Sequence, residues 1–221
     1  MSKHEKTDKT DKKKSIVEKI ISRVTRDGKV KSLIKSIDQG IEFEVRFGLN
    51  DGSGRFVPNL GVEAHKKIKK GINKNVSGEW EIERSVVMSN TNSQKNYRLM
   101  RYFNDDWKPI EDILMEKTVL SRHDNNDVGM RFSLAQEDIM PEGFTLPETD
   151  RTKNFFRYRY RESINLDKNW RIDLSKTSQL DSIKKEEIIE WKKNIMDDEK
   201  HGDEKNVNNY SYEIELEYVG K

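Results

Sequence analysis

Glutamates recur at alternate positions in two stretches, one early in the chain and one near its end. In a strand, positions two apart project from the same face. The stretches 41–48 and 210–219 therefore each have one charged face, formed by Glu42, Glu44 and Arg46 in the first and by Glu213, Glu215 and Glu217 in the second. Like charges ~7 Å apart along a strand repel one another, whereas carboxylate oxygens are the ligands that hard divalent cations prefer. These faces therefore indicate a metal site.

Two further stretches carry arginines in the same way. The stretch 154–165 has Arg157, Arg159 and Arg161 on one face, and 169–175 has Arg171 together with Asp173. Guanidinium groups are forked, permanently charged donors that match phosphate oxygens. For any single strand, a polar face turned toward water explains the alternation equally well. The segregation of the faces by sign favours a different explanation, a site for a metal-bound polyphosphate.

These faces belong to a chain that is predicted to be mainly β (α+β). Period-two alternation and turn residues predict strands over 41–48, 79–88, 95–103, 112–121, 128–137, 154–165, 169–175 and 210–219. Helical periodicity predicts helices from Ser15 to Val24 and over 30–37, 61–72 and 182–196. Eight strands with few helices indicate an antiparallel barrel or sandwich. The charged faces favour a closed eight-stranded barrel with charges in the lumen and apolar residues facing the flanking helices.

Composition sets limits on the class of protein. Charged residues make up 37% and hydrophobic residues 33% of the 221 residues, which approaches the composition of disordered chains, but 4 Trp, 7 Tyr and 8 Phe predict a folded core. The 42 basic residues nearly balance the 40 acidic ones, unlike a scaffold that binds nucleic acid by charge alone. No cysteine is present, which excludes disulfides and thiolate metal sites. No apolar run reaches the ~20 residues of a membrane span, so no membrane partner is expected.

The chain is expected to hold one domain, over residues 15–221, after a disordered basic tail over residues 1–14. The four histidines show no metal-ligand spacing. Another acidic face, formed by Glu79, Glu81 and Glu83, is expected on an outer or edge strand.

Several of these stretches together resemble one enzyme family. The segment IEFEVRFG (41–48) resembles the first-strand motif of the metal-dependent mRNA 5′-triphosphatases of fungi and large DNA viruses, which are triphosphate tunnel metalloenzymes. YEIELE (212–217) resembles their last-strand glutamate motif. Between them, in the expected order, stand MEKTVL (115–120), RFSLAQE (131–137), RYRYRES (157–163) and WRIDLSKT (170–177). The resemblance spans residues 41–219 as an ordered series.

The resemblance implies a role for each charged position. It implies that Glu42, Glu44 and Glu217 coordinate the metal, while Glu215 acts through a water molecule and Glu213 supports the basic side chains. With Arg159 and Arg161, these last two glutamates form the implied catalytic set. The implied phosphate-binding residues are Arg46, Arg98, Lys117, Arg131, Arg157, Arg159, Arg161 and Arg171. Glu137 and Asp173 are expected to hold these cations in place. Oxygen ligands without His or Cys favour Mg²⁺ or Mn²⁺ over zinc.

The implied activity is that of a polynucleotide 5′-phosphatase. It hydrolyses the γ-phosphate of 5′-triphosphate RNA to give diphosphate-ended RNA and phosphate, the first step of mRNA capping, with nucleoside triphosphates as side substrates. One alternative is an enzyme of the same fold that hydrolyses inorganic tripolyphosphate, thiamine triphosphate or free nucleotides. Another is a non-catalytic barrel that binds RNA or another polyanion.

The expected partners and location follow from the same resemblance. The chain lacks a KxDG nucleotidyl-transfer motif, so an RNA guanylyltransferase is expected as another domain or subunit. We expect an intracellular protein, cytoplasmic or nuclear, or at a viral replication site if it is viral. Abundant Lys, Asn and Ile favour an AT-rich genome, such as that of a large DNA virus.

Overall fold

The computed structural model describes residues 16–26, 28–35, 37, 41–91, 96–127, 129–144, 153–180 and 210–220. The predicted tail over residues 1–14, Ser15 and the predicted helix over 182–196 lie outside these described residues. Within them, no helix is long and apolar enough to cross a membrane.

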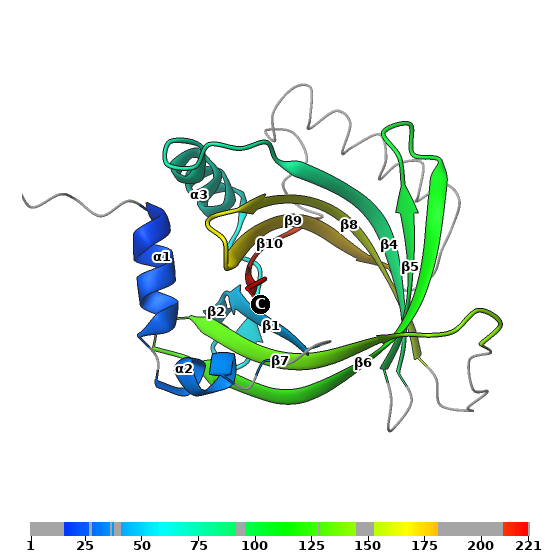
Figure 1. Cartoon of the computed structure of the whole chain (residues 1–221), viewed down its shortest axis with the longest axis horizontal. Helices are drawn as coiled ribbons and strands as arrows, with labels where there is room; N and C mark the ends of the chain where they lie inside the picture. The colour runs from blue at the N-terminus through cyan, green and yellow to red at the C-terminus, as the bar shows by residue number, and fades with distance from the viewer. Residues whose placement is uncertain are drawn as a thin grey trace, which may run out of the picture.

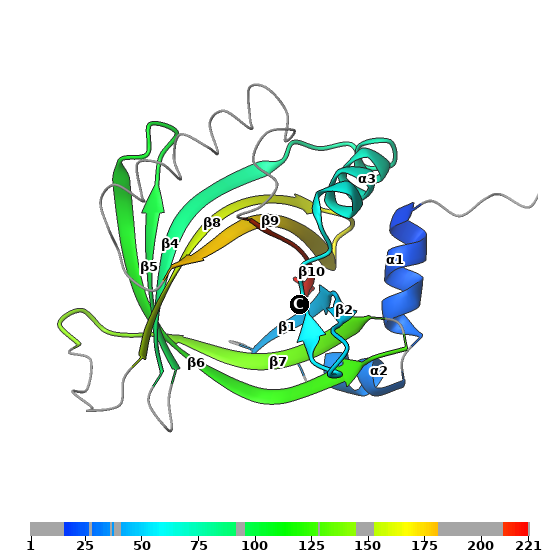
Figure 2. The same ribbon diagram turned by 180° about the vertical axis from the view of Figure 1, so that it is seen from behind.

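A closed barrel of eight antiparallel strands dominates the molecule (Figures 1 and 2). Its strands are β1 (Ile41–Phe47), β4 (Glu81–Thr91), β5 (Asn96–Phe103), β6 (Pro109–Asn125), β7 (Met130–Ile139), β8 (Lys153–Asn165), β9 (Trp170–Leu180) and β10 (Ser211–Tyr218). The order around the barrel is β1-β10-β9-β8-β4-β5-β6-β7, and β1 also pairs with β7. The predicted fold class is therefore confirmed, with the first and last strands of the barrel as neighbours.

Smaller elements flank the barrel on the side of β1 (Figure 1). They are α1 (Ile16–Thr25), α2 (Gly28–Lys35), α3 (Val62–Asn73), and a short hairpin of β2 (Leu49–Asn50) and β3 (Phe56–Val57). The hairpin lies in a stretch rich in glycine and turn residues. Each of its strands has only two residues, too few to show alternation of polar and apolar side chains. It passes very close to the end of β1, because a Cβ atom at Gly48 would lie 2.4 Å from the carbonyl oxygen of Val57.

Two strands extend well beyond the predicted ranges. β6 begins at Pro109 and runs to Asn125 through an irregularity between Val119 and Ser121. β9 continues to Leu180, where its polar residues Lys176 and Thr177 pair with both neighbours, β8 and β10. Backbone hydrogen bonds to two partner strands stabilise these extensions. Because such bonds do not depend on side-chain alternation, the sequence pattern does not reveal how far each strand extends.

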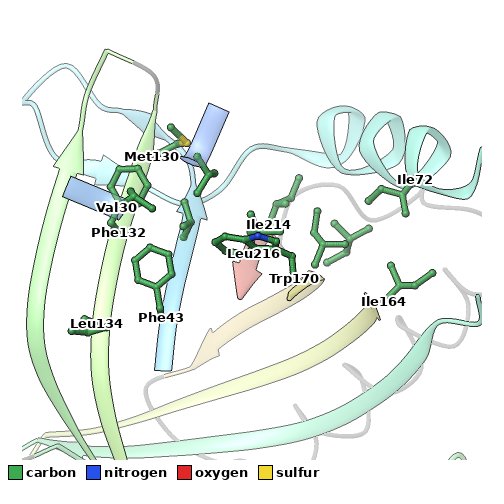
Figure 3. Close-up of a cluster of buried hydrophobic side chains, with 14 residues drawn as sticks. Val30, Phe43, Ile72, Met130, Phe132, Leu134, Ile164, Trp170, Ile214 and Leu216 are labelled. Carbon is green, nitrogen blue, oxygen red and sulfur yellow. The ribbon is translucent and has the colours of Figure 1, made fainter. Parts of the chain in front are cut away.

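The hydrophobic core lies outside the barrel, between its wall and the helices (Figure 3). The outward face of β1 contributes Phe43 and Val45, which are fully buried. The largest cluster of buried side chains combines the outward faces of β1, β7, β9 and β10 and Ile164 of β8 with one residue from each helix, namely Val24, Val30 and Ile72. Because apolar residues leave water on the outer surface of this wall, the charged residues at alternate positions turn into the lumen. This is the inverted barrel that the sequence predicts.

Candidate active site

The registers of β1 and β10 bring the two glutamate faces together. Glu44 lies opposite Glu217, and Arg46 lies opposite Glu215, as cross-strand partners. Partners in an antiparallel pair have side chains on the same face, so both glutamate sets project into one lumen. Segments that are far apart in the sequence thereby form one charged wall.

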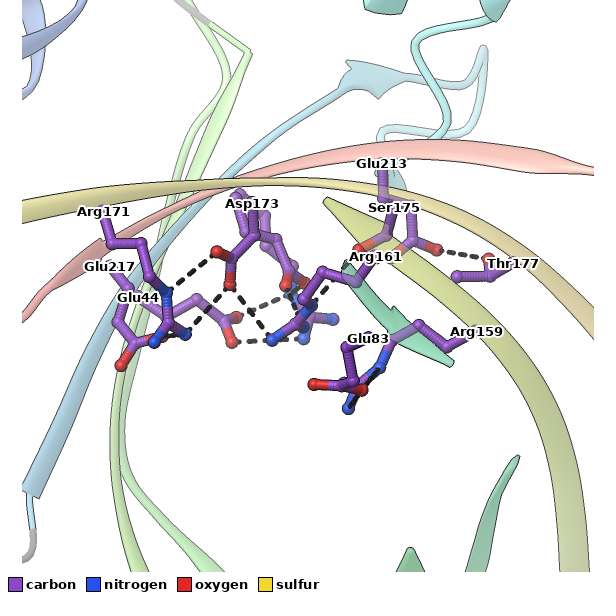
Figure 4. A network of polar contacts seen from close by, with 12 residues as sticks. Glu44, Glu83, Arg159, Arg161, Arg171, Asp173, Ser175, Thr177, Glu213 and Glu217 are labelled. Atoms are coloured by element: carbon purple, nitrogen blue, oxygen red, sulfur yellow. Dashed lines mark hydrogen bonds and ion pairs between the residues drawn. The ribbon is translucent and has the colours of Figure 1, made fainter. Parts of the chain in front are cut away.

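A network of ion pairs runs across four strands of this wall (Figure 4). Arg46 Nε lies 2.6 Å from Glu44 Oε1 and 2.8 Å from Glu215 Oε1. Arg161 donates to Glu215 Oε2 over 2.8 Å and lies 3.0 Å from Asp173 Oδ2. Asp173 also accepts from Arg171 over 2.9 Å. Asp173 thus pairs with two arginines, Arg161 and Arg171.

The electrostatic state of Glu215 follows from this network. Burial alone would raise the pKa of Glu215, but Arg46 and Arg161 outweigh burial and hold that pKa well below its usual range. The same contacts raise the pKa of Arg161 despite its burial. The Glu215 carboxyl is therefore ionised at neutral pH, where it is a hydrogen-bond acceptor and a weak base.

A cavity of about 280 Å³ opens in the half of the lumen toward which β5, β7, β8 and β10 end. Its acidic lining residues are Glu42, Glu83, Glu137 and Glu217. Its basic lining residues are Arg98, Lys117, Arg159, Arg161 and Arg171. The structure therefore gathers at one cavity two of the three predicted metal ligands and five of the predicted phosphate-binding residues.

Two of the cavity cations are incompletely compensated by carboxylates. Arg98 makes no ion pair within the described part of the chain, and its buried Nε has no hydrogen-bond partner there. Burial lowers the pKa of Arg98, and this lowering prevails over the nearby carboxylates. Arg159 is paired with Glu83 at 2.6 Å, yet burial and the neighbouring Arg161 lower its pKa. A buried, under-neutralised guanidinium beside a cavity is costly unless an anion binds there.

The predicted metal ligands are each held by a cation of the protein. Glu42 pairs with Lys117, Glu44 with Arg46, and Glu217 with Arg171. Among the described residues, no three carboxylate or imidazole groups form a ready-made metal site. Occupation of this site by a cation would therefore require these carboxylates to exchange partners.

The donor set nevertheless fits a divalent cation. Burial raises the pKa of Glu42 to about 7, with Glu137 and Glu44 adding to the rise although Lys117 opposes it. Burial also raises the pKa of Glu217, and the pairing with Arg171 does not cancel this rise. Two carboxyls whose ionised forms remain under-neutralised, on adjacent strands of one lumen, are oxygen donors suited to Mg²⁺ or Mn²⁺.

Three of the predicted phosphate-binding residues do not line this cavity. Arg131 pairs with Asp124 at 2.7 Å and lies over the ring of Phe56, toward the opposite end of the barrel. Arg157 pairs with Glu213, and Arg46 is held within the ion-pair network. Glu137, predicted to hold a cation, pairs with Lys117 at 2.7 Å.

Two features of the lumen differ from the predictions. Glu83 was expected on an outer or edge strand, which is wrong, because its carboxylate faces Arg159 in the cavity (Figure 4). Glu83 lies opposite Arg161 in the register of β4 and β8, and this pairing of opposite charges is the signal that would have placed Glu83 in the lumen. The second difference is a set of apolar residues that line the same cavity, although apolar residues were expected only on the outer face. They are Met100, Tyr102, Ile113, Met115 and Ile139.

This closed antiparallel barrel of eight strands with a charged lumen has the triphosphate tunnel fold, as the comparison with solved structures shows. No protein-family model and no curated protein sequence matches this chain.

Solved structures share the fold at low sequence identity. The triclinic structure of the Mimivirus capping enzyme triphosphatase is similar with a TM-score of 0.62 and 17% identity, covering 89% of this chain and 89% of that chain. Its monoclinic form gives a TM-score of 0.64 at 16% identity over the same shares. The S. pombe Pct1 RNA triphosphatase gives a TM-score of 0.51 at 14% identity, covering 93% of this chain and 79% of that chain. The expected resemblance to viral and fungal RNA triphosphatases is thereby confirmed at the level of the fold.

Proposed function

We propose that this chain is a metal-dependent RNA 5′-triphosphatase that hydrolyses the γ-phosphate of triphosphate-ended RNA. One observation carries the proposal: the cavity exposes under-neutralised charges of both signs. Arg98 and Arg159 lack full compensation by carboxylates, and Glu42 and Glu217 lack full compensation by cations. A metal-bound triphosphate would satisfy both sets, because it brings a cation to the acidic wall and phosphate oxygens to the basic wall.

The basic residues would bind and orient the triphosphate. Arg98 and Lys117 approach the cavity from β5 and β6, while Arg159, Arg161 and Arg171 approach it from β8 and β9. Cations on both sides can hold successive phosphates and neutralise the charge that develops on the leaving diphosphate. Because the guanidinium groups of Arg159 and Arg161 are anchored by Glu83 and Asp173, they need little reorganisation during the reaction.

The metal would be Mg²⁺ or Mn²⁺, held by Glu42, Glu44 and Glu217. When bound, it would neutralise phosphate oxygens and lower the pKa of a neighbouring water molecule. The lowered pKa of Glu215 makes its carboxylate a weak base, so we assign to it the orientation of Arg46, Arg161 and the attacking water rather than removal of a proton. Glu213 anchors Arg157 and would act at a greater distance from the reacting phosphate.

RNA as the substrate is supported by the fold shared with a capping enzyme triphosphatase and an RNA triphosphatase. An RNA guanylyltransferase domain or subunit would then use the diphosphate-ended product. Residues 15–221 would form the catalytic domain, at an intracellular site of mRNA synthesis, and nucleoside triphosphates would be side substrates.

The decisive experiment measures phosphate release from γ-labelled triphosphate RNA with Mn²⁺, with Mg²⁺ and with a chelator. We expect release only with a divalent cation, and a loss of at least about 100-fold in Glu217→Gln, since metal charge stabilisation supplies several kcal/mol. The control Asp112→Asn removes an exposed carboxylate from an ion pair with Arg101 and should leave release unchanged.

The alternatives predict other outcomes. Binding of the RNA without metal-dependent release would identify a non-catalytic polyanion-binding barrel. Full activity of a folded Glu217→Gln protein would contradict the metal assignment, with folding checked by circular dichroism.

A further inference from the structure

The cavity changes character along its length. On β5, β6 and β7, the cavity-lining residues nearer the end of the barrel are aromatic or apolar, whereas the next lining residue, deeper in the lumen, is charged. Glu111, which lies opposite Tyr102 at the rim of the barrel, does not line the cavity. From the end inward, the order is Tyr102, Met100, Arg98 on β5, then Ile113, Met115, Lys117 on β6, and Ile139, Glu137 on β7. The same transition on three adjacent strands divides the cavity into an outer apolar part and an inner charged part.

The apolar side chains form one continuous surface, here called the apolar patch (Met100, Tyr102, Ile113, Met115 and Ile139). Met100 lies opposite Ile113, and Met115 lies opposite Ile139, in the registers of the three strands. With strands ~4.8 Å apart, the patch is ~10 Å wide. It extends from Met115, which is 7% exposed, to Ile139, which is 71% exposed. The patch therefore connects the buried part of the cavity with solvent.

Core packing does not account for this surface. The hydrophobic core lies on the other side of the barrel wall, under the helices, and the apolar patch faces the cavity instead. Arg159 links the two parts of the cavity, because its Nη2 lies 3.9 Å from Met100 Sδ. Apolar surface next to convergent polar groups in one cavity is typical of a site for a ligand with an apolar and a charged part.

The chemistry of the patch suits a flat ring. Tyr102 is half-buried at the outer part of the cavity, where its ring can stack on an aromatic ligand. Met100 adds a polarizable sulfur, and Ile113 adds a flat aliphatic surface. Stacking of this kind accepts any nucleobase, because every base has a π-face.

We infer that the apolar patch binds the nucleobase of a nucleoside 5′-triphosphate group, whose phosphates point inward toward Arg98 and Lys117. The direction of the phosphates rests on the proposed function, whereas the base-binding residues go beyond it. The base can belong to the first nucleotide of an RNA or to a free nucleotide, since both join a base to a triphosphate. The patch would make this lumen selective for nucleoside triphosphates over inorganic tripolyphosphate.

The test compares ligands with and without a base in Tyr102→Ala and Ile139→Ser. The ligands are GTP, a short triphosphate-ended RNA, ribose 5-triphosphate and inorganic tripolyphosphate. We expect kcat/KM to fall roughly tenfold for GTP or the RNA, as for loss of one stacking contact, with a change of less than about twofold for the two ligands without a base. The matched control is Ile110→Ser on β6, the strand between those of Tyr102 and Ile139, where Ile110 is 65% exposed and does not line the cavity. Ile110→Ser should behave as the wild type.

An equal loss for all four ligands, or no loss for any, would overturn the inference while leaving triphosphate hydrolysis in place. If none of the ligands is hydrolysed, the proposed function fails, and the patch is then tested by binding alone. In that case, competition against a fluorescent GTP analogue should show tighter binding of GTP than of tripolyphosphate, and Tyr102→Ala should remove the difference. Equal competition by the two ligands in the wild type would contradict base binding.

Discussion

The two halves of the lumen contain similar side chains but differ in how completely the charges are paired. In the half of the lumen toward which β1 ends, opposite the cavity, Arg157 pairs with Glu213 and Arg131 pairs with Asp124. In the cavity half, Arg98 has no ion-pair partner among the described residues, and the pKa of Glu42 is raised to about 7 by burial. A buried charge with a good partner stabilises one arrangement of the wall, whereas an under-neutralised charge is retained at a cost and points to a ligand. Incomplete compensation of charge, as at Arg98 and Glu42, therefore indicates ligand-binding residues better than residue type does.

The largest effect is expected at Arg161, which belongs to both kinds of region. It lines the cavity and pairs with Glu215 and Asp173, two carboxylates that are almost fully buried. Arg161→Gln would leave these carboxylates under-neutralised and should lower the free energy of unfolding by about 3–5 kcal/mol, with loss of activity. Urea denaturation and phosphate release measure the two effects. An unfolding free energy equal to that of the wild type would show that the network is not structural.

A smaller effect, on activity alone, is expected at Arg98. Arg98→Gln removes a buried cation without leaving a carboxylate unpaired, so the protein should be at least as stable as the wild type. Because one phosphate-binding donor is lost, kcat/KM should fall roughly 100-fold. The matched control is Arg101→Gln on the same strand, where Arg101 is 50% exposed and pairs with Asp112. A marked loss of stability in Arg98→Gln would contradict the distinction between the two halves.

The smallest effect is a pH dependence of stability at Glu42. Its pKa is about 7 in the folded protein and 4.5 ordinarily, so the folded state binds more protons between these values. Stability should therefore fall as pH rises from about 4.5 through about 7, by on the order of 2 kcal/mol. Without metal, thermal unfolding followed against pH should show this slope, and Glu42→Gln should reduce it. Mn²⁺ should raise Tm more at pH ~8 than at pH ~6, and an unchanged slope in Glu42→Gln would assign the slope to other groups.

Alternation in the sequence predicts the barrel and most of its charged wall. A strand with one charged and one apolar face packs its apolar face against the outer core, so its charged face must point into the lumen. β1 and β10 are such strands, and their pairing follows from closure of the barrel. β5 is different, since Tyr97 and Leu99 on one face and Met100 and Tyr102 on the other are all apolar or aromatic. For such a strand, alternation shows which residues share a face but not which face is inside.

The pairing of charges is not predictable from the sequence for a similar reason. Arg98 and Arg159 are the same residue type at equivalent inward positions, yet only Arg159 has a carboxylate partner. That difference depends on Glu83, which reaches Arg159 across the pairing of β4 with β8. Registers between distant strands thus decide which cations are left for a ligand, and only the folded structure shows them.

The pairing of β1 with β10 has a consequence for how the protein is made. Contacts between these strands join residues separated by most of the chain, and contacts of such high sequence separation slow folding. During synthesis, Glu42 and Glu44 emerge long before their neighbours Glu215 and Glu217, so the acidic wall assembles only after β10 has left the ribosome. Until then β1 has an unpaired edge that can pair with other strands. The alternating charges on this strand disfavour such pairing, and the same residues would thus protect the nascent chain before they form the site.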